Sequence, residues 1–328
     1  MRKSPCCASS VRRFGRRRRQ CSSCLRTWRY RTKKRGRPRL RSDSRLFDRI
    51  LIQRRSLTEL ARARGVSRQA LCHRFKVELN RQIRRGGLAR TTRGRAILII
   101  DGLWFKFKRR PWVIYLMALR PVRGNTATFI DPCVLPGRES LSGWKAAVNT
   151  ISTDRKRQVQ AIVVDDFTGC TTLADENNWV LQLCHFHMLS RLRARLGFRR
   201  PRGVTLISLR QQAYRLVETA LETSDQNQLT HALCELDERY VNSELPWKYK
   251  NILRQFIRRI QQYRAYRIHP NLRLPKTTGS AEAMGRRIRD LLGRTRSLST
   301  AKALELWARN YVRIHPNVAC NAADLSTK

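Results

Sequence analysis

Apolar residues gather into strand-like runs in the middle third of the chain. Three such runs follow residue 95, and a helix-period run and two more strand-like runs come after them. Short continuous apolar runs bounded by turn residues are typical of strands that are buried on both faces. We therefore predict strands at 96–107, 111–120, 126–135 and 161–164, and a fifth within 179–188 that runs into a helix. Helical spacing over 139–151 predicts a helix with these inward residues: Leu141, Trp144, Ala147, Val148 and Ile151.

Helical patterns replace the strand patterns after the fifth strand. They are clearest at 209–222 and 249–263, and a last helical segment starts at Ser280 and places Ile288, Leu291 and Leu292 toward the sheet. The order of elements predicts an α/β sheet that is interrupted by an all-α insertion. The expected parts are a first core segment at 95–196, the insertion at 197–267, a last core segment at 268–312 and a C-terminal tail at 313–328.

Charge sets the first third of the chain apart. The 328 residues carry 70 Lys and Arg against 23 Asp and Glu, and 32 of these basic residues but only 4 of the acids precede residue 97. A formal net charge of +47 predicts association with a polyanion, and double-stranded DNA is the expected partner. The longest apolar run, 112–119, is too short to span a membrane, and no leader pattern precedes it. We expect a soluble, cytoplasmic, DNA-associated protein.

Cysteine spacing over residues 1–33 resembles a zinc ribbon. Cys6 and Cys7 come first, and Cys21 and Cys24 follow as a Cys-x-x-Cys pair. Two pairs on facing turns give Zn²⁺ its tetrahedral set of thiolates. The first pair departs from the usual spacing, because Ser4 stands where the partner of Cys7 is expected. One structural Zn²⁺ and a degenerate ribbon without metal therefore both stay open.

A basic segment at 34–42 contains the run Arg-Gly-Arg-Pro-Arg. Its arginines are Arg35, Arg37 and Arg39. The run resembles an AT-hook, whose arginines enter a narrow minor groove. Similar runs occur in simple basic linkers, and a disordered basic tail is the alternative interpretation for residues 1–42.

Residues 43–94 have the pattern of a helix-turn-helix. Leu57, Leu60 and Ala61 share one face of a first helix, and Gly65 and Val66 form the turn. A second helix starts at Ser67, with these residues expected to point inward: Ala70, Leu71 and Phe75. The start of such a second helix reads the major groove, so we expect base contacts from Ser67, Arg68, Gln69 and Arg74. An ordinary helical hairpin with a glycine turn is the alternative.

Two acids end predicted central strands. Asp101 follows the apolar run 96–100, and Asp165 follows 161–164. Burial of a carboxylate costs free energy unless the group is paired or bound to metal. A third acid, Glu282, opens a later helix, which also carries Arg286, Arg287 and Arg289 as candidates for phosphate contact. Three carboxylates form an oxygen site suited to two Mg²⁺ ions, with Mn²⁺ as a substitute, and such a site can cleave a phosphodiester.

Five motifs in order resemble the bacterial Mutator-type insertion-sequence transposases over residues 95–312. They are IDGLWFK with Asp101, LPGRESLSGW with Glu139, Ser140 and Trp144, VVDDFTG with Asp165 and Gly169, QLCHFH with Cys184 and His187, and TTGSAE with Glu282. The resemblance implies an RNase H-like catalytic core whose Asp-Asp-Glu triad cleaves and joins DNA strands at the ends of an insertion sequence. It also implies a homodimer or higher oligomer, because two ends must meet. The chain departs from the family where Gly279 replaces an Asn, and in its Arg-rich N-terminal region.

Several residues of this core have two interpretations. Glu139 is either a carboxylate favoured at the start of a helix or a residue near the active site. Cys184 and His187 have metal-ligand spacing, but without a second pair nearby they fit bracing of the core better than metal binding. Trp247 fits either packing or stacking on an unpaired base. Core packing is expected of the other tryptophans of this region: Trp104, Trp112, Trp144 and Trp179.

The two neighbouring aspartates are not equivalent. Side chains alternate along a strand, so Asp165 and Asp166 should point apart. The family pattern ends at Gly169 and selects Asp165 as the metal ligand, which leaves Asp166 as a turn acid. For the whole chain, the alternative function is a non-catalytic sequence-specific DNA-binding protein or a decayed transposase. An RNase H-type nuclease that does not transpose would share the metal site.

Overall fold

The structure is a computed structural model that describes residues 11–13, 18–21, 25, 27–29, 44–53, 55–85, 94–107, 110–193, 204–294 and 300–320. The chain has two compact units, Met1–Asp43 and Ser44–Lys328. It is mixed α/β, as the sequence predicts. Several predicted site residues lie outside the described residues: Cys6, Cys7, Cys24, Arg35, Arg37 and Arg39.

The first unit contains a three-stranded antiparallel sheet. Its strands are β1 (Val11–Arg13), β2 (Arg18–Cys21) and β3 (Thr27–Arg29), in the order β1-β2-β3. Cys21 ends β2 and is buried. Its carbonyl accepts a hydrogen bond from the N–H of Leu25 at 3.0 Å, and Leu25 has a φ of 55°. Cys21 is the first cysteine of the Cys-x-x-Cys pair, and the second, Cys24, lies outside the described residues.

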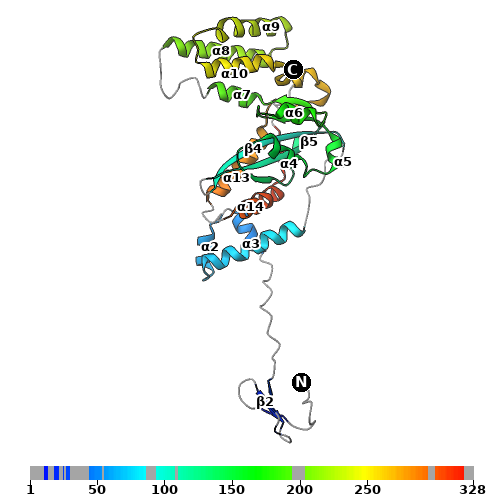
Figure 1. Ribbon diagram of the computed structural model, residues 1–328, viewed down its shortest axis with the longest axis vertical. Helices are drawn as coiled ribbons and strands as arrows, with labels where there is room; N and C mark the ends of the chain where they lie inside the picture. Colours follow the sequence, from blue (N-terminus) through cyan, green and yellow to red (C-terminus); the bar gives the residue numbers. More distant parts are fainter. Residues whose placement is uncertain are drawn as a thin grey trace. The chain divides into compact units, whose positions relative to one another are not determined.

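A seven-stranded mixed sheet forms the centre of the second unit (Figure 1). The strands are β4 (Ala96–Phe107), β5 (Arg110–Pro121), β6 (Thr126–Phe129), β7 (Cys133–Pro136), β8 (Val159–Val164), β9 (Val180–Leu183) and β10 (Asn317–Ala319). They lie in the order β10-β6-β5-β4-β8-β9, and β7 also pairs with β5. Strands β8 and β9 run parallel to β4, whereas the other pairings are antiparallel. The long strands β4 and β5 confirm the predictions at 96–107 and 111–120.

Two predictions about strands were wrong. The single strand expected at 126–135 is divided into β6 and β7, which pair with different parts of β5. Pro132 lies between them, and proline has no N–H to continue a ladder. The expected tail at 313–328 contains β10, which pairs with β6 through Val318 and Ala127.

Strand alternation divides the interior into two cores. On β4, Ala96, Leu98 and Ile100 belong to one core, whereas Ile97 and Ile99 belong to the other. Successive side chains point to opposite faces of a sheet, so strands between two cores read as continuous apolar runs. Asp101 is an even number of residues from Ile97 and Ile99. Its side chain therefore points to the same face of the sheet as theirs.

Helices cover both faces of the sheet (Figure 1). The face of Ala96, Leu98 and Ile100 carries α4 (Leu141–Val148) and α6 (Cys170–Asp175), with α5 (Thr153–Gln158) leading into β8. The opposite face carries α13 (Gly279–Arg294) and α14 (Ala301–Ile314). Helix α4 confirms the helix predicted at 139–151. The short helix α5 was not predicted.

The tryptophan predictions were correct in part. Trp144 and Trp179 are buried, and Trp112 is half-buried. Trp104 is 47% exposed, so the prediction that it packs in the core was wrong. It follows Asp101 in the second half of β4, where most side chains are partly or fully exposed.

The helices at 44–85 pack on the face of the sheet that carries α13 and α14, within the same unit. They are α1 (Ser44–Phe47), the π-helix η1 (Asp48–Ile52), α2 (Leu57–Ala63) and α3 (Arg68–Arg85). Gly65 has a φ of +61° in the turn between α2 and α3, which glycine adopts without strain. The Phe75 ring of α3 meets the Trp307 ring of α14 edge to face at 4.9 Å. Leu71 and Phe75 are buried as predicted, but Ala70 is exposed and its inward assignment was wrong.

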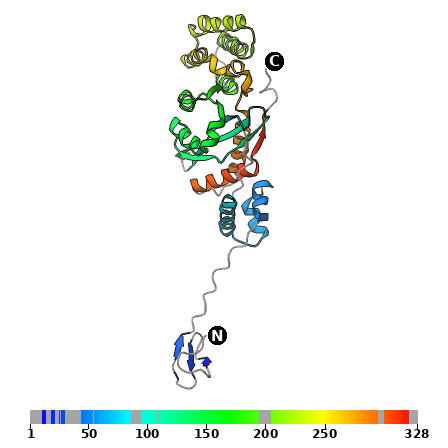
Figure 2. The same ribbon diagram turned by 90° about the vertical axis from the view of Figure 1, so that its right-hand side faces the viewer.

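The described part of the segment predicted as an insertion consists of helices joined by short loops. Its helices are α8 (Val204–Glu222), α9 (Gln226–Glu235), η2 (Leu236–Val241), α10 (Trp247–Arg258), α11 (Ile260–Tyr263), α12 (Ala265–Ile268) and η3 (Pro270–Leu272), and α7 (His185–Arg193) precedes them. Figure 2 shows the yellow-green helices of this segment gathered at one end of the sheet. Gln182 of β9 ties the segment to the sheet, because its amide donates to Tyr263 O at 2.8 Å and accepts from Tyr266 N at 2.8 Å.

Candidate functional site

Asp101 lies inside the second unit, between β4 and α13. The position that a Cβ atom would take at Gly285 of α13 is 3.7 Å from Asp101 Oδ2, so the helix passes directly over the carboxylate. Burial raises the pKa of Asp101 to about 6. The charge of His187 opposes this rise, whereas the carboxylates of Glu282 and Asp165 add to it. Asp101 is therefore a half-buried acid with two acidic neighbours.

The adjacent aspartates after β8 point to different partners, as the alternation of a strand predicts. Asp165 Oδ1 accepts the N–H of Asp166 at 2.6 Å, and Asp165 Oδ2 lies 3.9 Å from His187 Nε2. Asp166 instead accepts hydrogen bonds from Arg191 at 2.9 Å and from Arg259. Asp166 thus joins the end of the strand to α7 and to the end of α10, and Asp165 belongs to the acid cluster.

Glu282 reaches the same place from the first turn of α13. Its Oε1 accepts a hydrogen bond from Thr278 Oγ1 at 2.9 Å and lies 3.6 Å from His187 Nδ1. Thr278 is fully buried, and its carbonyl accepts the N–H groups of Ala281 and Glu282, which fixes the start of the helix. The motif TTGSAE therefore positions Glu282 through the residue that begins the turn.

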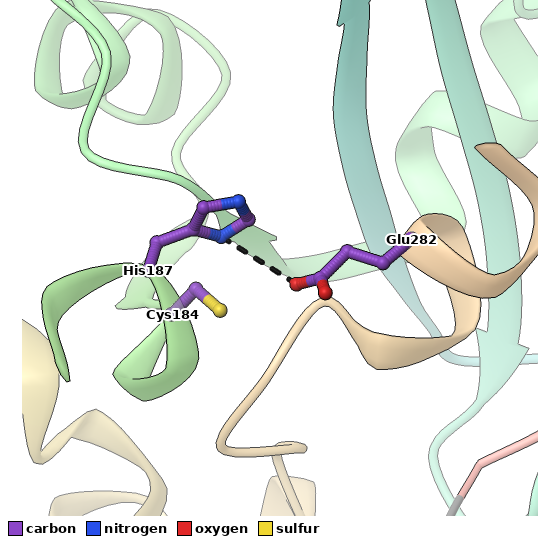
Figure 3. A group of neighbouring side chains, drawn as sticks. All are labelled: Cys184, His187 and Glu282. Atoms are coloured by element: carbon purple, nitrogen blue, oxygen red, sulfur yellow. Dashed lines mark ion pairs between the residues drawn. The ribbon is translucent and has the colours of Figure 1, made fainter. Parts of the chain in front are cut away.

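His187 lies between two of the three acids, and Figure 3 shows the side of its ring that faces Glu282. Its Nε2 faces Asp165 and its Nδ1 faces Glu282, at 3.9 and 3.6 Å. Burial alone would lower the pKa of His187, but the hydrogen bond to Cys184 and the charges of Cys184, Asp165 and Asp101 raise it to about 10. The side chain is therefore an imidazolium at neutral pH and offsets part of the negative charge around it.

A fourth carboxylate, Glu139, borders this group. Its Oε1 accepts a hydrogen bond from Trp144 Nε1 at 2.8 Å, and it lies over the backbone of Gly102. Burial raises the pKa of Glu139, and the charges of Asp165 and Asp101 raise it further. The start of α4 is capped by Ser140, whose hydroxyl accepts the N–H of Gly143 at 3.2 Å. Of the two interpretations of Glu139, its contacts favour the one near the acid cluster.

The arrangement is suited to a divalent cation. Asp101, Asp165 and Glu282 supply carboxylate oxygens, which are the ligands that Mg²⁺ prefers. Burial is the main cause of the raised pKa of Asp101, and the charges of Glu282 and Asp165 raise it further; a bound cation would relieve that repulsion. The oxygen donors therefore fit Mg²⁺. A second donor set overlaps them, because one ligand atom each from Cys184, His187 and Glu282 lie within 4.8 Å of one another.

The structure also places the candidate DNA-binding residues that it describes. Ser67, Arg68, Gln69 and Arg74 are exposed on or just before α3, and Ser67 Oγ accepts the N–H of Ala70 at 3.1 Å. On α13 these arginines are exposed: Arg286, Arg287 and Arg289.

Trp247 stands out in the helical segment because it is 71% exposed. It lines a cavity of about 370 Å³ together with Arg210, Pro246, Lys248 and Tyr249. A side chain this exposed is not packed in a core, so the exposure of Trp247 argues against the packing interpretation.

Three contacts of the site were not foreseen from the sequence. Thr278 links Glu282 to Cys184, Gly102 gives room to Glu139, and Arg259 holds Asp166. Thr278 and Gly102 lie inside the quoted motifs, so the motifs contained a signal for them. Arg259 is one of many arginines and carried none.

No protein-family model and no curated protein matches the chain. Over the residues that the structure describes, no helix is both long enough and apolar enough to cross a membrane.

Proposed function

We propose that the protein is a DNA transposase of an insertion sequence, with Asp101, Asp165 and Glu282 as its catalytic acids. The observation that carries the proposal is the meeting of three acids from distant parts of the chain. Asp165 and Glu282 contact opposite nitrogens of His187, and Asp101 lies against α13 one turn from Glu282. A cluster that concentrates like charges in a fold with few acids is unfavourable without a ligand, so it indicates a functional site.

The sheet supports an RNase H-like core as part of this proposal. Such a core needs three antiparallel strands followed by two parallel ones in the order 3-2-1-4-5. Strands β6, β5, β4, β8 and β9 have this order and these directions. The first two proposed catalytic acids then come from adjacent parallel strands, Asp101 from within β4 and Asp165 from directly after β8, and the register Ile99–Val163 brings them to the same level.

The proposed reaction assigns different roles to the acids, to Thr278 and to the arginines of α13. Two Mg²⁺ ions, when bound, would supply an activated nucleophile and stabilise the leaving oxygen of a phosphodiester. Asp101, Asp165 and Glu282 would hold them, and Thr278 orients Glu282 for this role. The exposed arginines Arg286 and Arg289 are placed on the helix of Glu282, where they would meet phosphates of the DNA.

Recognition of the element ends is assigned to the N-terminal third. In this proposal a helix-turn-helix formed by α2 and α3 reads the ends through Ser67, Arg68, Gln69 and Arg74. The ribbon and the AT-hook-like segment add affinity for DNA. A homodimer or larger oligomer would bring two ends together.

The proposal is tested by a strand-transfer assay with labelled element ends and Mg²⁺. Asp101→Asn, Asp165→Asn and Glu282→Gln should each abolish cleavage and joining while DNA binding persists. Asp290→Asn is the matched control, because Asp290 is an exposed acid on the same helix as Glu282. Activity that survives any of the three substitutions removes that residue from the triad.

Two outcomes would favour other functions. A chain that binds end DNA equally in chelator and in Mg²⁺, and never nicks it, is a non-catalytic DNA-binding protein or a decayed transposase. Cleavage without joined product and without preference for particular ends indicates an RNase H-type nuclease.

A further inference from the structure

The side chains of Cys184, His187 and Glu282 converge on one point from two helix starts (Figure 3). One ligand atom from each lies within 4.8 Å of the other two, and His187 Nδ1 is 3.6 Å from Glu282 Oε1. Zinc–ligand distances of about 2.0–2.3 Å in a tetrahedral site put neighbouring ligand atoms about 3–4 Å apart. The three atoms therefore need only a small inward movement to share one ion.

The ligands are held in place by the backbone around them. The N–H of Cys184 donates to Val164 O at 2.9 Å, which joins the end of β9 to the end of β8. The N–H of Thr278 donates to Cys184 Sγ at 3.3 Å. Residues three apart on a helical turn face the same side, so Cys184 places its sulfur beside the ring of His187. The sulfur is buried, and its position is set by two separate segments of chain.

The second nitrogen of His187 has the partner that metal-binding histidines usually have. With Nδ1 directed at Glu282 and Cys184, Nε2 faces Asp165 Oδ2 at 3.9 Å. A carboxylate that accepts the free ring N–H fixes the tautomer and orientation of a ligating imidazole. Asp165 Oδ2 lies on that side of the ring, at an ion-pair distance rather than a hydrogen-bond distance from Nε2.

We propose that Cys184, His187 and Glu282 form a binding site for a borderline divalent ion such as Zn²⁺, with Asp165 as the outer partner of His187. A thiolate, an imidazole and a carboxylate are all zinc ligands, whereas the sulfur makes this set unsuited to Mg²⁺. The fourth position is open to water. Binding through His187 Nδ1 releases the proton that this nitrogen carries.

The zinc site also has a consequence for strand transfer, which rests on the proposed function. Zn²⁺ at this site would take Glu282 as a ligand and would hold Asp165 through His187, so two of the three proposed catalytic acids would be engaged. Zinc and magnesium should then exclude one another, and zinc should inhibit strand transfer.

The test measures metal directly in the full-length protein without DNA. The chain is saturated with Zn²⁺, excess ion is removed, and the zinc content per chain is determined for the wild type and for Cys184→Ala and Glu282→Gln made separately. Each variant should hold one zinc fewer than the wild type, whatever the ribbon cysteines retain. Cys234→Ser is the control, because Cys234 is an exposed cysteine of α9 and should leave the zinc content unchanged.

Co²⁺ provides an independent signature. The wild type should show a sulfur-to-cobalt charge-transfer band whose intensity falls in Cys184→Ala, and circular dichroism verifies that each variant is folded. Asp165→Asn should weaken zinc binding about tenfold without abolishing it, as loss of an outer partner does. Equal zinc content and equal cobalt spectra in wild type and Cys184→Ala would overturn the site.

Competition is measured separately. Mg²⁺ in millimolar excess should lower the apparent zinc affinity of the wild type, and failure to do so would overturn mutual exclusion while leaving the zinc site intact. Because zinc content does not depend on catalysis, a chain without strand transfer can still support the zinc site. A chain that transfers strands but holds no zinc at Cys184 would support the proposed function and overturn the zinc site.

Discussion

The carboxylate of Glu139 lies directly against the backbone of Gly102. A Cβ atom added at Gly102 would lie 2.5 Å from Glu139 Oε1 and 2.6 Å from its carboxyl carbon. The carboxylate is not free to turn away, because it also accepts the indole N–H of Trp144 at 2.8 Å. Glycine next to Asp101 therefore makes room for a fourth acid beside the three proposed catalytic ones.

Gly102→Ala should destabilise the protein by about 1–3 kcal/mol, since an added methyl group in a packed site forces its neighbours to move. Urea unfolding measures the effect. Gly293→Ala is the matched control. A Cβ at Gly293 meets nothing within 4 Å, and alanine is favoured over glycine in a helix by about 1 kcal/mol, so this variant should be equally or more stable. Adding Glu139→Ala to Gly102→Ala should recover part of the loss, and strict additivity would contradict the contact.

The neighbours Asp165 and Asp166 should separate activity from stability. Asp166→Asn leaves Arg191 and Arg259 without their shared carboxylate, and the free energy of unfolding should fall by about 1–3 kcal/mol. Partial exposure of both arginines keeps the loss below that of a fully buried pair. Asp165→Asn should abolish strand transfer and leave the unfolding free energy nearly unchanged. The reverse assignment, an inactive but stable Asp166→Asn, would show that the wrong aspartate was chosen.

Stability of the magnesium-free protein should fall as the pH rises from about 4 to about 6. In this interval folded Asp101, with a pKa of about 6, keeps a proton that the unfolded chain has lost. Unfolding then releases a proton, so higher pH favours the unfolded state. At 1.36 kcal/mol per pKa unit the loss reaches at most about 3 kcal/mol.

Urea unfolding at several pH values checks this, with Asp101→Asn as the comparison. The variant should lack the part of the pH dependence that Asp101 contributes. An identical pH profile in both proteins would contradict a raised pKa at Asp101.

His187 should remain protonated well above neutral pH, because its pKa is raised to about 10 in the folded chain. Its contribution to stability is complete below the unfolded value of 6.5 and is lost as the pH rises through about 10. Histidine ring NMR signals measure this titration in the zinc-free protein. A midpoint near 6.5 for His187 would show that the acids around it do not hold the proton.

Arg68 and Gln69 should determine preference for the element ends. Both are exposed in the first turn of α3, so alanine at either should cost about 1–3 kcal/mol in binding to the specific end sequence and little in binding to random duplex. Arg254→Ala removes an exposed charge from α10 and should weaken both kinds of binding equally. Binding titrations at matched salt concentrations give the ratio of the affinity for the specific end sequence to the affinity for random duplex. An unchanged ratio for Arg68→Ala and Gln69→Ala would place end recognition elsewhere.

The predictable part of the fold is the part with long apolar runs. Strands β4 and β5 are buried on both faces over much of their length, so their sequences are continuously apolar and their bounds could be predicted closely. The short strands β6 and β7 have no such length, and only their separate pairing with β5 divides them. Ala70 shows a related limit, because an alanine fits an exposed helical position as well as a buried one.

The candidate site was predictable in its acids but not in their surroundings. Asp101 and Asp165 each follow an apolar run, and an acid in that position is informative in a chain with so few acids. Their assignment as metal ligands stays a prediction. The bond from Thr278 to Glu282, the placement of His187 between two carboxylates and the pairing of Asp166 with Arg259 join residues that lie between 4 and 95 positions apart.

By itself the sequence determined the charge of the chain, the alternation of its strands and the positions of the acids at the strand ends. These are properties of local sequence pattern. Side chains alternate along an extended segment, so the sequence already predicts that Asp165 and Asp166 point to opposite sides. Only the tertiary structure decided which groups meet. It brought α13 over Asp101, set Glu139 over Gly102 and placed one imidazole among the acids, because such contacts depend on how helices pack on the sheet. Packing of that kind depends on the whole chain and has no signature in any single segment.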